Sequence, residues 1–252
     1  MESKHHILLA GGSGLIGSHL IQLLLKKGHS VSVLSRREKN IQDVKCFLWD
    51  VEQEYIDINA LKNVTAILNL SGQGIADKAW SEQRKKELLK SRTKSTQLLF
   101  KTLANNPHTV ATFINASAIG IYKSGNDLLD ENSSHDNNFL ATICSAWESE
   151  SIRIQTLNIR TVIFRIGLVQ SKRGGMLKEM LLPIKFFIAP VFGNGKQWQS
   201  WIHIDDLCRM MLFAIENKNI QGVYNAVANE PLTNLHLLAQ SQAVTDLAIC
   251  RH

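Results

Sequence analysis

The chain has 252 residues, 44% of them hydrophobic and 20% charged, which is ordinary for a globular protein with one large domain or one domain and a small appendage. No apolar run is long enough to span a membrane, and the run behind the polar N-terminus is too short for a secretory signal, so we expect a cytoplasmic protein. The formal net charge of +6 comes from dispersed basic residues without a nucleic-acid-binding motif, which argues against a nucleic-acid partner.

A glycine-rich segment near the N-terminus separates a short apolar run at residues 7–9 from a periodic apolar segment at residues 20–25. Strand, glycine turn and helix form the context of a dinucleotide-binding fingerprint. The glycines permit a tight turn, a close approach of the backbone to a pyrophosphate, and close packing of the helix on the strand. The N–H groups at the start of that helix would face the phosphates. The cofactor-binding residues predicted here are Gly11, Gly12, Ser13, Gly14, Leu15, Ile16 and Gly17.

Two arginines follow the second predicted strand, about 20 residues after the glycines. NAD-binding proteins usually place Asp or Glu here, which accepts a hydrogen bond from the ribose 2′-hydroxyl. This chain has Ser35, Arg36 and Arg37, and two guanidinium groups can hold a 2′-phosphate through charge-assisted hydrogen bonds. The alternative is that two surface arginines simply end a strand. We expect NADP(H) as the cofactor.

Apolar, β-branched runs alternate with helical patterns along the first two thirds of the chain. This alternation predicts an α/β fold with a Rossmann-like, doubly wound parallel sheet. The later predicted strands are residues 31–34, 46–49, 65–70, 110–116 and 160–166, and the long helices are residues 81–104 and 139–157. The helix predicted over residues 81–104 carries basic residues that we expect on a solvated face. They are Arg84, Lys85, Lys86, Lys90, Arg92 and Lys94.

Two strand ends carry small residues that we expect beside the nicotinamide half of the cleft, because a flat ring requires close approach of the backbone. Each block taken alone is also an ordinary junction between a strand and a loop. The residues predicted to line the cofactor are Leu70, Ser71, Gly72, Ala116 and Ser117.

The composition changes at residue 170, where glycines, prolines and aromatic residues become frequent. We predict a cofactor-binding Rossmann domain at residues 1–169 and a smaller, substrate-side subdomain at residues 170–252, part of which returns to the Rossmann core. The four cysteines lie far apart without a CxxC pair or metal-ligand spacing, so we predict reduced, mostly buried thiols and no metal site. They are Cys46, Cys144, Cys208 and Cys250.

These motifs together resemble the extended short-chain dehydrogenase/reductases of the NAD-dependent epimerase/dehydratase superfamily, and more narrowly the atypical "epimerase family protein" branch. The resemblance covers about residues 5–240. It rests on the glycine turn, on the blocks at residues 69–72, 75–80, 91–92, 117–118, 139–141, 147–148, 165–167 and 174–177, and on the tryptophan-rich block at residues 193–206. Relatives often dimerise through helices that correspond to residues 81–104 and 139–157, so the resemblance implies a homodimer, while the basic face of the first of these helices argues against that pairing.

The resemblance also predicts where this chain departs from the usual mechanism. Typical members carry a Tyr-x-x-x-Lys pair, in which the tyrosine exchanges a proton and the lysine holds the nicotinamide ribose. By spacing, Ile143 stands in place of that tyrosine and Trp147 in place of that lysine, and neither can transfer a proton. The usual catalytic serine or threonine falls on Ala118, next to Ser117.

Substitute proton donors are few. Tyr122 follows the fifth strand, and we take it and Ser117 as the catalytic candidates, although a tyrosine there is often only a packing residue. Cys144 reads as a small buried residue, and Glu148 as a hydrogen-bond acceptor rather than a base.

Four residues of the tryptophan-rich block are expected on the substrate side or in a structural role. They are Trp198, Trp201, His203 and Asp205. We expect Asp205 or Asp206 to cap an apolar helix over 207–215, and His203 to brace the two subdomains. The last residues, 240–252, do not resemble the segment that relatives carry there, so we expect a truncated or frame-shifted C-terminus.

Two functions remain open. The first is an NADP(H)-binding oxidoreductase or epimerase-like enzyme for a small polar, sugar-nucleotide or carbonyl substrate, without the Tyr-x-x-x-Lys pair. The second is a non-catalytic protein that binds NADP(H) as a redox-sensing or regulatory ligand.

Overall fold

A mostly parallel, eight-stranded sheet forms the centre of the structure, a computed structural model that describes residues 4–171, 174 and 194–236. The strands run in the order β11-β7-β6-β5-β1-β2-β3-β4. Their bounds are β1 His6–Ala10, β2 Ser30–Ser35, β3 Lys45–Asp50, β4 Tyr55–Ile56, β5 Ala66–Asn69, β6 Thr112–Ala118, β7 Arg160–Ile166 and β11 Gly222–Ala226. This confirms the predicted Rossmann-like, doubly wound sheet.

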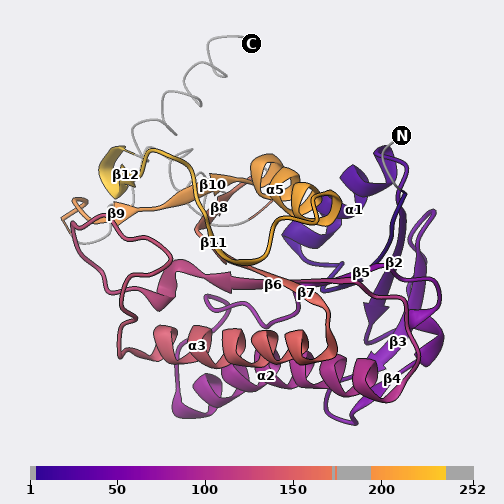
Figure 1. Ribbon diagram of the computed structural model, residues 1–252. Helices are drawn as coiled ribbons and strands as arrows, with labels where there is room; N and C mark the ends of the chain where they lie inside the picture. The colour runs from indigo at the N-terminus through magenta and orange to yellow at the C-terminus, as the bar shows by residue number, and fades with distance from the viewer. Residues whose placement is uncertain (1–3, 172–173, 175–193, 237–252) are drawn as a thin grey trace, which may run out of the picture.

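Helices cover both faces of the sheet (Figure 1). Helices α1 and α5 lie side by side on one face, and α2 and α3 lie together on the other (Figure 1). Their bounds are α1 Leu15–Lys26, α2 Glu82–Asn105, α3 Phe139–Ile152 and α5 Ile204–Glu216. One hydrophobic core includes the buried faces of α1 and α5, and a second core on the other side of the sheet includes residues of α2.

The strand order reverses next to β1. From β1 the chain adds β2 and β3 on one side, and it then returns to add β5, β6 and β7 on the other. In open sheets of this kind, ligands bind beyond the carboxyl ends of the strands at the point of reversal. The glycine turn that follows β1 lies at that point.

The central strands form because they are buried on both sides. Residues 7–10 of β1 are fully buried, and such a strand is a continuous apolar run rather than an alternating one. Helix α1 instead buries one stripe, formed by Gly17, Leu20, Ile21 and Leu24, at the spacing of one helical face.

Two elements differ from the prediction. The edge strand β4 pairs antiparallel with β3, and its two residues were too short a run to stand out in the sequence. The helix predicted over 139–157 ends as an α-helix at Ile152 and continues as a 3₁₀ helix, Arg153–Leu157. Asn158 then takes a left-handed conformation (φ 58°), which stops the helix before β7.

The later part of the chain contributes both to the main sheet and to two small ones. Strand β11 pairs parallel with β7 at the sheet edge, and α5 packs beside α1. The small sheets join β8 Leu168–Gln170 to β10 Trp201–His203, and β9 Trp198–Gln199 to β12 Leu232–Thr233. The domain boundary at residue 169 remains a prediction, and the C-terminal residues 240–252 lie outside the described residues. In the described ranges, no helix is long and apolar enough to cross a membrane.

Candidate functional site

The glycine turn after β1 has the close backbone contacts that the fingerprint predicts. Gly11 has a φ of 86°, and a Cβ atom there would lie 2.6 Å from the carbonyl oxygen of Leu70. A Cβ atom on Gly17 would lie 2.8 Å from the Cα of Gly12, so only glycine lets α1 start this close to the turn. The turn is closed by a 3.1 Å hydrogen bond from the Gly14 amide to the Gly11 carbonyl.

The N-terminus of α1 is electrostatically open to an anion. Gly14 is its N-cap residue, no side chain caps the first turn, and no acidic residue lies in it. The first N–H groups of a helix have no partner within the helix, and they carry the positive end of its dipole. A cavity of about 270 Å³ adjoins this end, and its walls are Ser13, Gly14, Leu15, Ser18, His19, Gly174 and Ile204. The turn can therefore hold a phosphate group through backbone donors.

The two arginines after β2 lie at the surface. The Ser35 hydroxyl donates to the carbonyl oxygen of Arg37 over 2.7 Å, which folds the chain back at the end of the strand. Arg36 and Arg37 are exposed, and neither forms an ion pair with a carboxylate of the described residues. Arg37 also lines a second cavity of about 300 Å³ with residues 38–39 and 46–48. Both guanidinium groups are available for an anionic ligand at this end of the sheet.

Buried amides fix the carboxyl ends of β5 and β6. The Asn69 side chain donates to Asn115 Oδ1 over 2.8 Å and to Thr96 Oγ1 over 3.0 Å. Its own oxygen accepts from the backbone N–H and the hydroxyl of Ser71. The side-chain amide of Asn69 thus uses its oxygen and its nitrogen in hydrogen bonds, and these bonds hold the segment after β5 that is predicted to line the cofactor.

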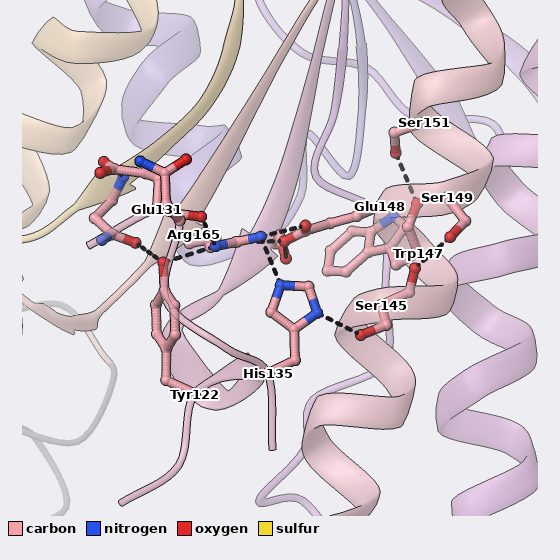
Figure 2. Close-up of polar contacts among 12 residues, drawn as sticks. Tyr122, Glu131, His135, Ser145, Trp147, Glu148, Ser149, Ser151 and Arg165 are labelled. Atoms are coloured by element: carbon pink, nitrogen blue, oxygen red, sulfur yellow. Dashed lines mark hydrogen bonds and ion pairs between the residues drawn. The ribbon is translucent and has the colours of Figure 1, made fainter. Parts of the chain in front are cut away.

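A buried arginine organises the other strand ends (Figure 2). Arg165 on β7 donates to both oxygens of Glu148 on α3, each over 2.9 Å. It also donates to the hydroxyl of Tyr122 over 2.7 Å, to the carbonyl oxygen of Glu131 over 3.0 Å, and to Nε2 of His135 over 3.1 Å. All five N–H donors of the guanidinium are therefore used, and Nε2 of His135 is the acceptor in its contact, because arginine has only donors.

Both catalytic candidates belong to this network. The Ser117 hydroxyl donates to Glu148 over 2.6 Å, and the Tyr122 hydroxyl donates to Asn225 on β11 over 2.8 Å. Ser117 is 3% exposed and Tyr122 8%. The structure thus places the two hydroxyl groups around one guanidinium, with each proton directed at an acceptor.

Arg165, His135 and Asn225 were not predicted as site residues. The signal for Arg165 was present, since a charged residue inside an otherwise apolar strand must find a partner when it is buried. No local pattern marks His135 or Asn225, because they join the network from a loop and from a strand distant in the sequence.

Ile143 and Trp147 stand in place of the usual tyrosine and lysine by the spacing of the sequence. Both side chains are buried in the structure. Burial, and secondarily the charge of Glu148, raises the pKa of the neighbouring thiol of Cys144, so this cysteine is not a thiolate. Arg92 on α2 lies over the Trp147 ring, with its Cζ atom 5.3 Å from the ring centroid.

The solvated basic face predicted for α2 is wrong at two positions. Arg84 and Arg92 are buried, because both reach back to backbone carbonyls of the loop that precedes the helix. Arg84 donates to Gly74 O over 2.8 Å, and Arg92 donates to Gln73 O over 3.0 Å.

The tryptophan-rich block lies in and around the small sheets. Trp198 on β9 is half exposed, and Trp201 on β10 donates its indole N–H to Glu230 O over 3.0 Å. The predicted cap of the next helix was wrong, since α5 begins at Ile204 and His203 caps it by accepting from the Asp205 amide. Asp205 instead contacts His19 of α1 over 2.5 Å, and this contact joins the two helices.

The cysteines that the structure describes are not paired in disulfides. Cys46, Cys144 and Cys208 are free thiols, the last two buried, and Cys250 lies outside the described residues. No group of three or more potential ligand side chains gathers as a metal site within the described ranges.

Comparison with known proteins places these features in a family. A sequence model of the NAD dependent epimerase/dehydratase family matches residues 7–226. Epimerase family protein SSP1921 of Staphylococcus saprophyticus is 33% identical over 88% of this chain and 75% of its own length. Epimerase family protein Mb2239 of Mycobacterium bovis is 37% identical over 90% of this chain and 75% of its own.

Solved structures share the fold. The human epimerase family protein SDR39U1, whose crystal structure contains NADPH, matches with a TM-score of 0.81 and 31% identity over 91% of this chain and 76% of the human one. UDP-glucuronic acid 4-epimerase of Bacillus cereus matches with a TM-score of 0.82 at 21% identity, over 96% of this chain and 83% of its own, a likeness of fold alone. The extent of these matches establishes that the chain belongs to the NAD dependent epimerase/dehydratase family.

Proposed function

We propose that this protein binds NADP(H) and acts as an oxidoreductase or epimerase-like enzyme on a small polar substrate such as a carbonyl compound or a sugar nucleotide. One observation carries the cofactor: an uncapped helix N-terminus without an acidic residue lies at the same sheet edge as two exposed arginines without carboxylate partners among the described residues. The first arrangement suits a pyrophosphate and the second a 2′-phosphate.

The residues present fit this cofactor in their chemistry. Residues 11–17 supply backbone donors for the pyrophosphate, and Arg36 and Arg37 supply charge for the 2′-phosphate. Residues 70–72 and 116–117 line the nicotinamide half. The structure of human SDR39U1 with NADPH supports the preference for NADP(H) over NAD(H), since that protein is 31% identical to this chain. When bound, the cofactor supplies a hydride donor or acceptor.

The chain itself must manage the proton. Ser117 is the better of the two candidates, because its hydroxyl donates to a carboxylate, Glu148, in a short charge-assisted hydrogen bond. Tyr122 donates to the amide oxygen of Asn225, which is a far weaker base. We therefore assign the proton-handling role to Ser117 and a positioning role to Tyr122.

The second candidate function is a non-catalytic protein that binds NADP(H) as a redox-sensing or regulatory ligand. The burial of Ile143 and Trp147 favours it, because neither side chain can exchange a proton or hold a ribose as a tyrosine and lysine would. The two functions share the cofactor site and differ only in turnover.

A titration with NADPH and NADH tests the shared part. Ligand binding to the folded state raises its melting temperature, by an amount equivalent to about 2.7 kcal/mol at one hundred times Kd. We expect a clear preference for NADPH that Arg36→Glu abolishes. Lys62→Glu is the matched control, since this exposed lysine precedes β5 at the opposite edge of the sheet. If neither nucleotide shifts the melting temperature, the cofactor assignment is wrong.

A turnover screen then separates the two functions. NADPH consumption with carbonyl substrates, or NADP⁺ reduction with alcohols, is measured for the wild type and for Ser117→Ala. If the wild type turns over a substrate and Ser117→Ala lowers the rate by about 100-fold, the result supports an enzymatic function with Ser117 as the proton donor. NADPH binding without turnover across the screen favours the regulatory function.

A further inference from the structure

The most unusual charge in the molecule is that of Arg92 on α2. The side chain is 8% exposed, and no carboxylate of the described residues pairs with it. Burial lowers the pKa of Arg92, as expected for a cation with little compensation. In contrast, the buried guanidinium of Arg165 has a carboxylate counter-ion, Glu148, which compensates its charge.

The donors of Arg92 are only partly used. Nη1 donates to Leu88 O over 3.0 Å and, at 3.5 Å, reaches Ser91 Oγ, while Nη2 donates to Gln73 O over 3.0 Å. Nε, the atom through which Arg165 holds one oxygen of Glu148, donates to none of the described residues. A mostly buried guanidinium without a counter-ion is a costly arrangement unless an anion completes it.

The position of Arg92 is that of a ligand site. A Cβ atom on Gly72 would lie 3.3 Å from Arg92 Cζ, so the guanidinium lies against the backbone of this exposed residue. Gly72 follows the carboxyl end of β5, beside the point where the strand order reverses. The guanidinium also lies over the ring of Trp147, which stabilises the cation without neutralising it.

The Trp147 ring offers a second unmet donor. Its Nε1–H is buried and has no hydrogen-bond acceptor. Figure 2 shows this ring next to the Glu148 side chain, whose two oxygens already accept from Ser117 and Arg165. The cation without a carboxylate partner and the unpaired N–H thus lie at one ring, and among the described residues neither a counter-ion for the first nor an acceptor for the second is present.

The geometry points to Arg92 as the residue that recognises an oxyanion, a carboxylate or phosphate group, of the substrate. Gly72 permits the approach of that group because it has no side chain, and the Trp147 ring packs against the guanidinium. The inference rests on the proposed function only in calling this oxyanion part of the substrate. It narrows the substrate class to anionic compounds.

The test is a titration with inorganic phosphate and, separately, malonate, in the presence of saturating NADPH, which covers the glycine turn and the two arginines after β2. Melting temperature and tryptophan fluorescence are both recorded. We expect either anion to raise the melting temperature and to change the emission of Trp147. In Arg92→Met, the affinity should fall about tenfold or more, as for the loss of a hydrogen bond to a charged group.

Arg84→Met is the matched control. Arg84 is also buried on α2, also donates to the loop over residues 73–74, and also has an Nε without a partner among the described residues, but unlike Arg92 it has a counter-ion, Glu87, at 3.3 Å. Its loss disturbs the same loop and should leave the anion affinity within about threefold of the wild type. Trp147→Phe keeps an aromatic face, so it should retain the thermal shift and lose most of the fluorescence change.

Several results would overturn the inference. One is the absence of any effect of phosphate and malonate on the wild type, and another is an equal loss in Arg84→Met and Arg92→Met. If Arg92→Met does not fold, Arg92→Gln retains a donor for Gln73 O without the charge, and wild-type anion affinity in that variant refutes the inference. If NADPH does not bind, the same titrations without it still compare the variants, so the two proposals fail separately.

Discussion

The ion pair between Glu148 and Arg165 makes the strongest single prediction about stability. Their side chains are 6% and 4% exposed, and the carboxylate accepts both an Nε–H and an Nη–H as well as the hydroxyl of Ser117. Glu148→Gln keeps the size and shape of the side chain but removes its charge. The guanidinium is then left buried without a counter-ion, and breaking a buried pair from one side costs about 3–5 kcal/mol.

Thermal and urea unfolding measure this cost. In a chain of this size, 1 kcal/mol lowers the melting temperature by about 2–4 °C, so we expect a fall of about 6–20 °C. Glu52→Gln is the control, since Glu52 forms an exposed pair with Lys94 and such pairs are worth about 1 kcal/mol or less. Replacing both partners, as Glu148→Leu with Arg165→Met, should cost less than the sum of the single changes. A loss below about 1 kcal/mol in Glu148→Gln would refute the reasoning.

Three further changes test other parts of the structure. Gly17→Ala places a Cβ atom 2.8 Å from the Cα of Gly12, so we expect urea unfolding to show a loss of about 1–3 kcal/mol in stability. Gly125→Ala is the control and should show no loss, because the nearest atom to its Cβ is 4.0 Å away. Burial raises the pKa of Cys208 to about 12, so mass mapping after brief alkylation at pH 8 should find it unmodified, unlike the partly exposed Cys46. Burial lowers the pKa of His6, so the unfolded chain binds a proton that the folded one does not, and the melting temperature should fall below about pH 6.5, less steeply in His6→Gln.

The fold was predictable because its signals are local. A short continuous apolar run such as residues 7–10 is typical of a strand buried on both faces, and four glycines within residues 11–17, before an amphipathic stripe, indicate the turn between them. The antiparallel strand β4 was not predictable, because two residues carry no periodicity.

The glycine turn after β1 was predictable for the same reason, since consecutive residues form it. The network around Arg165 was not, because its partners come from α3, β6, β11 and a loop, and only the fold brings them together. The exposure of basic residues on α2 was misjudged because helix periodicity says which residues share a face. It does not say that the loop before the helix folds over Arg84 and Arg92 and offers them its carbonyl groups.

The residues at positions 92 and 147 are best understood together. A lysine at position 147 would bring an ammonium group next to the Arg92 guanidinium, and two cations in contact repel each other strongly where water is excluded. A tryptophan there presents the electron-rich face of its ring, which attracts a cation and covers it from one side. The neutral aromatic residue is thus what allows a buried arginine to lie beside Gly72. Replacing Trp147 by lysine alone would therefore bring two buried cations together, and it would not rebuild the tyrosine–lysine pair that the resemblance leads one to expect.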